Sequence, residues 1–375
     1  MDNKQFMKKA GLWGLCVAAA VFFCGGRLEA GSSLRLGGEA GKILRLDADN
    51  VEVDMGGLSE GEEFQAAQAR LASVDMEQAC SYFLKDWKTA VPEVHENYSD
   101  PEGKQAPIAV YEDEGNSFAV SDYDFYFVGQ EAHYIWNAFY PDRATDEYNA
   151  ELYSVDADLD FMSREAAWEQ LKEGLQKAGV DMSHAVSRIT YSLDWETLQQ
   201  EESCVDVNGS VCEEELKPGW SEEDEGYHYY ITQSWEGIPI YNGAYVNQDE
   251  KTEAPMEIYQ TREGIRYARM DRWFQIEPGD KSFRLAAFED VMDTLEIVLE
   301  KRCSGAREGN PLTVEKAALY LFAVETDVEG LYDLEPVWVC TLAEERADLG
   351  ERAYTSRFCV PIHAVTAKEM EEVEI

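Results

Sequence analysis

One octapeptide pattern occurs twice in this chain, and it limits the fold more than any other feature of the sequence. RLAAFEDV at residues 284–291 aligns with REAAWEQL at residues 164–171, 120 residues earlier. The strand-like segments that follow also correspond in residue type: Tyr320, Phe322, Val324, Glu325 and Thr326 match Tyr191, Leu193, Trp195, Glu196 and Thr197. Two matches in the same order favour a duplicated structural unit over chance.

Both copies of the pattern predict an amphipathic helix. In the first copy Ser163 is a suitable N-cap and Gly179 a suitable end. The apolar positions between them recur at helical spacing: Ala167, Trp168, Leu171, Leu175 and Ala178. The second copy has a longer apolar face: Phe288, Val291, Met292, Leu295, Val298 and Leu299. Each face predicts a helix that packs against a sheet.

Strands are predicted on both sides of these helices. In residues 152–161, apolar residues alternate with Asp156, Asp158 and Asp160, which is typical of a strand with one buried face. ITYSLDWETL, YHYYITQSW and IPIYNGAYV follow the first helix, and IRYARMDRWFQIE and ALYLFAVETD flank the second. The sequence therefore predicts an α+β fold with two tandem strand-helix-strand-strand units, antiparallel sheets each packed by a helix, at residues 151–247 and 248–375.

An N-terminal α+β lobe is predicted over residues 31–150. KILRL and VEV form a strand-like arm at residues 31–58. Ser59 and Glu62 make a capping-box pattern before Phe64, Ala67 and Leu71, which predicts a helix. A second helix carries Met76, Ala79, Cys80, Phe83 and Leu84. Residues 97–107 read as a loop, and the aromatic-rich residues 108–140 as sheet.

Residues 1–30 have the parts of an export signal, or of a short anchor. Lys4, Lys8 and Lys9 precede an apolar run at residues 10–24, and small residues follow. Fifteen helical residues reach only ~22 Å, short of the ~30 Å hydrocarbon core, which favours a cleaved signal over a stable membrane span. Neither Cys16 nor Cys24 lies in a convincing lipidation site, so cleavage, lipidation and retention stay open. We expect an extracytoplasmic protein, secreted or membrane-anchored at the cell surface.

The net charge of the chain is −43, from 32 basic and 75 acidic residues. Nucleic acid and anionic membrane surfaces are poor partners for such a chain. We therefore expect no nucleic-acid partner, and membrane contact only through the N-terminal segment. Basic surfaces of other proteins and cations remain as candidate partners.

Six cysteines follow the leader, an even number that suits disulfides in an exported chain. Cys204 and Cys212 flank a short polar segment with an Asn208-Gly209 turn pair. Cys340 and Cys359 lie in two successive strand-like runs. We predict two disulfides, Cys204–Cys212 and Cys340–Cys359. The absence of a CxxC spacing gives a zinc or dithiol redox site little support.

An acidic exported chain is suited to binding calcium. Asp156, Asp158 and Asp160 open like a calcium loop, but Phe161 stands where glycine is needed and Ala167 where a bidentate acid is needed. The wet face of a strand is the favoured interpretation, with adventitious Ca²⁺ binding as the alternative. No resident cofactor is expected.

Catalytic motifs are missing from the sequence. There is no G-x-S-x-G elbow, no S-x-x-K set, no phosphate-binding loop and no zinc-protease histidine pair. Two carboxylates suffice for a glycosidase, so a carbohydrate-active enzyme is not excluded. Two aromatic clusters could stack on sugars if exposed or form sheet core if buried: Tyr227, Tyr229, Tyr230, Trp235, Tyr241 and Tyr245, and Tyr123, Phe125, Tyr126, Tyr134, Trp136, Phe139 and Tyr140.

Besides the duplicated unit, about the last 220 residues contain GIPIY at residues 237–241, LEPVW at 334–338 and the closing VPIHAVTAKEM. In these features the chain resembles cell-envelope proteins of Gram-positive bacteria related to PepSY and YycH/YycI modules. His363-Ala364 and Thr366-Ala367 depart from the Asp-Ala and Thr-Gly usual in that ending. The resemblance implies a non-catalytic role, binding or regulating an envelope protein of the sensor-kinase or protease type. A carbohydrate-binding or carbohydrate-active envelope protein is the alternative function.

Overall fold

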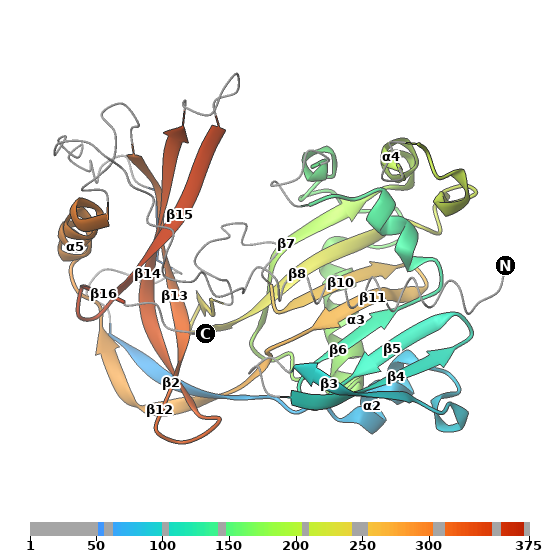
Figure 1. Ribbon diagram of the computed structural model, residues 1–375, viewed down its shortest axis with the longest axis horizontal. Helices are drawn as coiled ribbons and strands as arrows, with labels where there is room; N and C mark the ends of the chain where they lie inside the picture. Colours follow the sequence, from blue (N-terminus) through green and yellow to red (C-terminus); the bar gives the residue numbers. More distant parts are fainter. Residues whose placement is uncertain are drawn as a thin grey trace.

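The computed structural model describes residues 52–55, 63–99, 105–141, 148–204, 210–241, 254–302, 312–346 and 354–370. These residues form two lobes, each built on one β-sheet (Figure 1). Helices pack on the sheets, which confirms the predicted α+β class. None of the helices in this part of the chain is long and apolar enough to cross a membrane. The predicted leader, and most of the arm after it, lie outside the described residues.

The larger sheet has nine strands and is antiparallel throughout, in the order β3-β4-β5-β6-β11-β10-β8-β7 with β9 against β8. Its strands are β3 (Glu93–Ser99), β4 (Gln105–Asp113), β5 (Asn116–Val120), β6 (Phe125–Val128), β7 (Ala185–Leu193), β8 (Gly226–Trp235), β9 (Ile238–Pro239), β10 (Met256–Thr261) and β11 (Gly264–Met270). The sheet predicted at residues 108–140 is confirmed as far as Val128, by β4, β5 and β6, but it is wrong for residues 132–137, which form a 3-10 turn.

Both faces of this sheet are covered, so its strands are apolar on two sides. On one face Tyr227, Tyr229 and Ile231 pack under α2 (Met76–Phe83) and α3 (Arg164–Lys177). On the other face Tyr230 and its neighbours lie under short elements: η3 (Ala132–Asn137), η4 (Ala150–Leu152) and α4 (Trp195–Glu201). Two further turns are η2 (Trp87–Thr89) and η5 (Glu213–Glu215).

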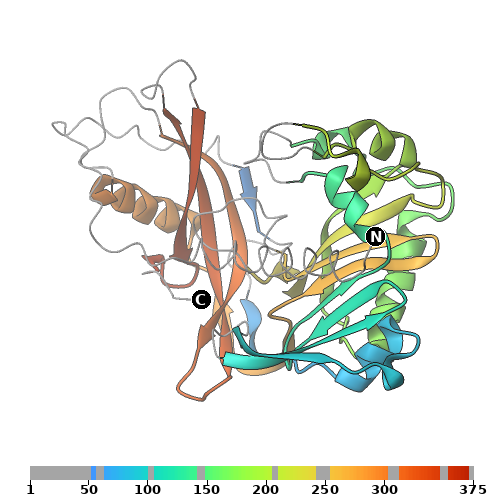
Figure 2. The same cartoon turned by 45° about the vertical axis from the view of Figure 1, so that its right-hand side comes forward.

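The second lobe is a seven-stranded sheet with one helix on it. Its strands are β1 (Glu52–Asp54), β2 (Glu63–Leu71), β12 (Phe274–Arg284), β13 (Leu312–Glu325), β14 (Tyr332–Arg346), β15 (Tyr354–His363) and β16 (Lys368–Glu369). Helix α5 (Phe288–Arg302) buries Val291, Leu295 and Leu299 in this lobe's core, beside Trp338 of β14. Figure 2 shows α5 on the side of the sheet that faces away from the nine-stranded lobe.

The nine-stranded lobe is inserted between two neighbouring strands of the other sheet. Strands β2 and β12 pair over most of their length, and the N–H of Ala72 donates to the carbonyl of Trp273 at 2.7 Å where the chain leaves and returns (Figure 1). Residues between these points build the inserted lobe. The predicted boundaries at 150/151 and 247/248 both fall inside it, so the three predicted units do not correspond to the two sheets.

Two predicted elements are wrong over their whole length, and the strand predicted at ITYSLDWETL ends at Leu193, because Asp194 caps helix α4. Residues 63–71 form a strand instead of a helix: Phe64, Ala67 and Ala69 are buried between β12 and β14, and this pairing overrides the helical propensity of the alanines. Residues 152–161 form turns instead of a strand. The Ser154 hydroxyl accepts the N–H groups of Asp156 and Ala157, which competes with ladder formation.

The helices of the duplicated pattern are confirmed as α3 and α5. Ser163 caps α3 by accepting the N–H of Ala166, and Gly179 follows the helix with φ +87°, a conformation that suits glycine. Each helix is followed by an antiparallel pair, β7–β8 after α3 and β13–β14 after α5. Only the second copy has the predicted preceding strand, β12.

Candidate binding site at the edge of the nine-stranded sheet

A surface hollow lies where the start of α3 meets the edge strand β7. Its volume is about 470 Å³. It is lined by the turn before α3, the first turns of that helix and the middle of β7: Val155, Asp156, Arg164, Glu165, Trp168, Ser187, Arg188, Ile189, Thr190 and Tyr229. We call this set the β7 hollow.

The local sequence fixes which side chains reach the hollow. Ser163 starts α3, and the Asp158 carboxylate accepts the N–H of Arg164 at 2.8 Å, so the first turn is held at its N-terminus. Arg164 and Trp168 are four residues apart and therefore share one helix face. The Arg164 guanidinium donates to the carbonyls of Val155 and Thr190 and joins the turn to the strand.

Strand β7 is the last strand of the sheet in the described part of the chain, and its outer side is only partly occupied. The N–H of Ser192 donates to the Ser154 carbonyl at 2.8 Å, and Arg164 binds the Thr190 carbonyl. The register of the β7–β8 ladder shifts between Ser187 and Ile189, so Arg188 lies at a bulge of β7. Such bulges re-aim side chains and interrupt an edge. The first half of β7 is thus the exposed stretch of the edge.

The bulged Arg188 connects the hollow to the other lobe. Its guanidinium donates to the Tyr320 hydroxyl of β13 at 3.1 Å and lies 5.5 Å from the centre of that ring. Nearby, the Ile240 N–H bonds back to Gln233, and Ile240 forms a parallel bridge with Leu321. The Arg188 side chain and the residue after β9 therefore join this side of the nine-stranded lobe to β13.

The hollow is chemically mixed. Two guanidinium groups, Arg164 and Arg188, stand beside two carboxylates, Asp156 and Glu165, so their formal charges cancel. Trp168 is half-buried, with its ring 5.7 Å from Tyr229 and the Lys172 ammonium 5.5 Å above it. Backbone groups of an edge strand, an apolar wall and charges of both signs suit an extended peptide segment better than a single small ion.

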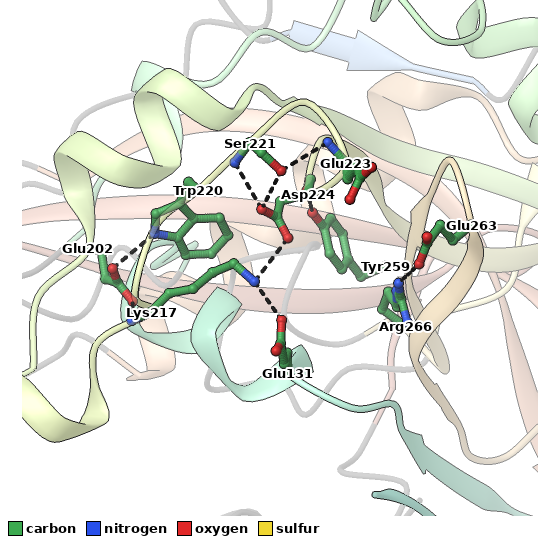
Figure 3. A network of polar contacts seen from close by, with 10 residues as sticks. All are labelled: Glu131, Glu202, Lys217, Trp220, Ser221, Glu223, Asp224, Tyr259, Glu263 and Arg266. Carbon is green, nitrogen blue, oxygen red and sulfur yellow. Dashed lines mark hydrogen bonds and ion pairs between the residues drawn. The ribbon is translucent and has the colours of Figure 1, made fainter. Parts of the chain in front are cut away.

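A second polar cluster pins the cover of the opposite face. The Lys217 ammonium lies 2.7 Å from the Glu131 carboxylate and 3.0 Å from that of Asp224, and only 9% of its side chain is exposed. The same ammonium lies 5.4 Å from the centre of the Tyr134 ring and 5.5 Å from that of Trp220. Figure 3 shows the ammonium pointing between the two carboxylates. We call these five residues the Lys217 clip.

The clip sets the ionisation of its members. Burial alone would lower the pKa of Lys217, but hydrogen bonds to Glu131 and Asp224 outweigh it, and the pKa is raised. The same hydrogen bond lowers the pKa of Glu131. Glu202 completes the arrangement, accepting the indole N–H of Trp220 at 2.9 Å and the Lys217 backbone N–H at 2.7 Å. All contacts are internal, so the clip acts on stability.

His228 and Glu257 form a buried pair under the same cover. Their Nε2 and Oε1 atoms are 2.8 Å apart, and His228 is only 2% exposed. Burial would raise the pKa of Glu257, but the hydrogen bond and charge of His228 and the nearby Arg269 guanidinium hold it below the usual value. The rings of Phe139 and Tyr230 lie 5.0 and 5.1 Å from His228. This pair is enclosed by side chains and serves the core.

The predicted Cys340–Cys359 disulfide is wrong. In the β14–β15 ladder Cys340 stands opposite Val360, and Cys359 stands opposite Thr341. Because side chains alternate, this offset of one residue puts Cys340 in the core under α5 and Cys359 on the other face. Cys204 and Cys212, by contrast, are brought together, and the N–H of Cys212 donates to the Cys204 carbonyl at 2.9 Å. Both are thiols in the structure.

The three aspartates predicted as weak metal-ligand candidates do not form one cluster. Asp156 lines the β7 hollow, Asp158 holds the start of α3, and Asp160 is exposed. In the described residues no group of three or more histidine, cysteine or acidic side chains is placed to hold a metal ion.

Five residues of the two predicted aromatic clusters are buried in the core. Tyr227, Tyr229, Tyr230, Phe125 and Phe139 are at most 4% exposed, whereas Trp136 is 37% exposed. Tyr245 lies outside the described residues. The buried tyrosines are not available to stack on sugars.

The sequence did not single out Arg188, Ser187 or the opening turn of α3 as a site. A weak signal is visible in retrospect. Arg188 directly precedes the predicted strand ITYSLDWETL, with Ser187 before it and Thr190 two residues after it, in a chain with few basic groups. Only the fold shows that this strand is an edge and that α3 begins beside it.

Comparison with known proteins identifies a solved structure with a similar fold. No protein-family model and no curated protein matches this chain. Among solved structures, it is similar to a crystal structure of an uncharacterized protein from Eubacterium rectale ATCC 33656 at 1.45 Å resolution. The two share 14% sequence identity with a TM-score of 0.57, over 86% of this chain and 90% of that one. This coverage exceeds either lobe alone, so the likeness extends over both.

Proposed function

We propose that this chain is an exported, non-catalytic envelope protein that binds another envelope protein, and that the partner lays an extended segment along the outer edge of β7. The observation that carries the proposal is the exposed first half of this edge strand beside the β7 hollow. Strand addition supplies main-chain hydrogen bonds, and pockets for alternate side chains supply specificity.

The hollow defines what the bound segment carries. One side chain enters between Trp168 and Val155, and its neighbours meet the guanidinium groups of Arg164 and Arg188 and the carboxylates of Asp156 and Glu165. A segment that alternates apolar and charged residues satisfies both requirements.

The net charge of this chain indicates the charge of the partner's surface. With a net charge of −43, this chain attracts basic surfaces and repels acidic ones. We therefore propose a partner whose surface around the bound segment is basic. Such complementarity mainly raises the rate of association.

The PepSY and YycH/YycI resemblance remains part of the proposal and names the kind of partner, a sensor kinase or a protease. We also propose that α3–β7–β8 and α5–β13–β14 descend from one duplicated unit. In support, each is a helix on one sheet face followed by an antiparallel pair.

Carbohydrate binding or cleavage is the alternative function, and the burial of the tyrosines removes its main support. It becomes the stronger candidate if envelope polysaccharide, and no protein, protects the β7 hollow.

A photo-crosslinking residue at Val186 tests the proposal. Val186 lies on β7 and is 37% exposed, whereas the control position, Ile297 on α5, is 52% exposed and belongs to the other lobe. The probe is incorporated into the full chain in its native envelope. We expect a protein adduct from Val186 that the Ile297 probe does not give. Equal adducts from both positions would contradict a site at β7.

Hydrogen exchange with the captured partner tests the binding mode. Strand addition should slow amide exchange in β7 and leave β3, the opposite edge of the same sheet, unchanged. Slower amide exchange in β3 alone would place the binding site at the edge opposite to β7 and contradict the proposal.

A further inference from the structure

Cys204 and Cys212 are placed to react with each other. The N–H of Cys212 donates to the Cys204 carbonyl at 2.9 Å, and the Cys212 sulfur lies 3.9 Å from the Ser210 carbonyl. Both side chains are partly exposed, so an oxidant can reach them. Two cysteines whose backbones are hydrogen-bonded to each other need little backbone movement to form a disulfide.

The other cysteines in the described residues cannot compete for this reaction. Cys340 and Cys359 lie on opposite faces of their sheet. Cys80 is fully buried, and burial raises its pKa to about 11. Among the five cysteines that the structure describes, an oxidant therefore meets a single reactive pair.

Asn137 already closes the base of the loop without a covalent bond. Its carbonyl accepts the N–H of Ser203, just before the first cysteine, and its side-chain amide donates to the Glu215 carbonyl at 3.0 Å, shortly after the second. The two chain segments are thus held side by side on η3. A covalent link here adds to an arrangement that the fold has already made.

We propose that the mature protein carries a Cys204–Cys212 disulfide. This inference rests on the proposed export, because thiols are oxidised outside the cytoplasm. One thiolate attacks a low-molecular-weight or protein disulfide and releases one carrier thiol. The second thiolate then displaces the carrier from the mixed disulfide, so the two cysteines lose two electrons and two protons to the oxidant.

The disulfide secures the segment that carries the Lys217 clip. Residues after Cys212 pass through η5 to Lys217 and Trp220, which cover the face of the nine-stranded sheet opposite α3. A covalent link between this segment and the end of α4 lowers the conformational entropy of the unfolded chain. We expect the oxidised protein to unfold a few degrees above the reduced one.

Peptide mapping tests the proposal in two steps. First, the purified full-length protein is incubated with glutathione disulfide and then alkylated. We expect a linked peptide joining Cys204 to Cys212, and no linkage in Cys204→Ser, whose Cys212 is alkylated. If Cys204 and Cys212 of the wild type are both alkylated instead, their proposed proximity is refuted, and the proposed binding at β7 is unaffected.

Second, the protein is taken from its native envelope with its thiols blocked at the moment of lysis. A linked peptide supports the proposal, whereas alkylated Cys204 and Cys212 overturn it for the mature protein. Crosslinking from Val186 in a Cys204→Ser, Cys212→Ser chain separates the two proposals, because partner capture there does not need the disulfide.

Discussion

Replacing Lys217 with methionine tests how the cover of the nine-stranded sheet is held. The substitution removes the ammonium, which lies over the rings of Tyr134 and Trp220, and keeps a side chain of similar volume. The two carboxylates lose their partner at 2.7 and 3.0 Å. The measurement therefore reports the interactions of the ammonium charge, with the carboxylates and with the two rings, and not a change in side-chain volume.

The magnitude follows from burial. Breaking a fully buried ion pair costs about 3–5 kcal/mol, and breaking an exposed one about 0–1 kcal/mol. Lys217 is 9% exposed, Asp224 23% and Glu131 56%, so the clip lies between these limits. We expect Lys217→Met to lower the free energy of unfolding by about 2–3 kcal/mol.

Urea denaturation followed by tryptophan fluorescence measures this change. Lys85→Met is the matched control, because the Lys85–Glu114 pair spans 3.8 Å with side chains 76% and 66% exposed. We expect the control to change the free energy by less than about 0.5 kcal/mol. Equal effects of the two substitutions would refute the reasoning.

The pH dependence supplies a second check with a defined sign. The folded pKa of Glu131 is lowered from 4.5, so its contribution is present above that pH and is lost as the pH falls through the lower, folded value. The folded pKa of Lys217 is raised from 10.5, so its contribution is present below that pH and is lost as the pH rises through the higher, folded value. The difference between wild type and Lys217→Met should be greatest between these limits and shrink in acid.

Three further predictions concern packing, architecture and charge. Gly226→Ala should cost about 2–3 kcal/mol in the same denaturation assay, because its Cβ would lie 2.5 Å from the Gln260 carbonyl oxygen, whereas Gly219→Ala has open space and should be nearly neutral. Leu175→Ala should speed amide exchange mainly in the inserted lobe, and Leu295→Ala mainly in the seven-stranded lobe, each at a cost of about 2–5 kcal/mol. Association with the captured partner, measured by stopped flow, should slow markedly between about 50 and 500 mM salt, since oppositely charged surfaces are screened.

The elements set by local sequence were predictable. Ser163 and Gly179 bound α3 as their capping chemistry requires, and the apolar spacing of α2 matched its buried face. The elements set by distant partners were not. Residues 63–71 have the alanines and the capping pattern of a helix, but their neighbours in the sheet are β12 and β14, more than 200 residues away. No local pattern contains that pairing.

Register is the reason one disulfide prediction failed and the other stays open. Both predictions placed two cysteines on adjacent segments, which the structure does. In β14 and β15 the outcome depends on a single residue of offset, which decides the face that each side chain occupies. Cys204 and Cys212 are only eight residues apart in the chain, so the sequence contained enough information to bring them together.

The position of the candidate site follows from the insertion. A lobe placed between β2 and β12 must leave and rejoin its host sheet at one point, where Ala72 meets Trp273. The Arg188–Tyr320 contact and the Ile240–Leu321 bridge then join the β7 side of the inserted lobe to β13, away from that crossing. These contacts hold the β7 side of the lobe in place before a partner binds. On binding, the partner's segment would therefore lose conformational entropy, whereas β7 would lose little.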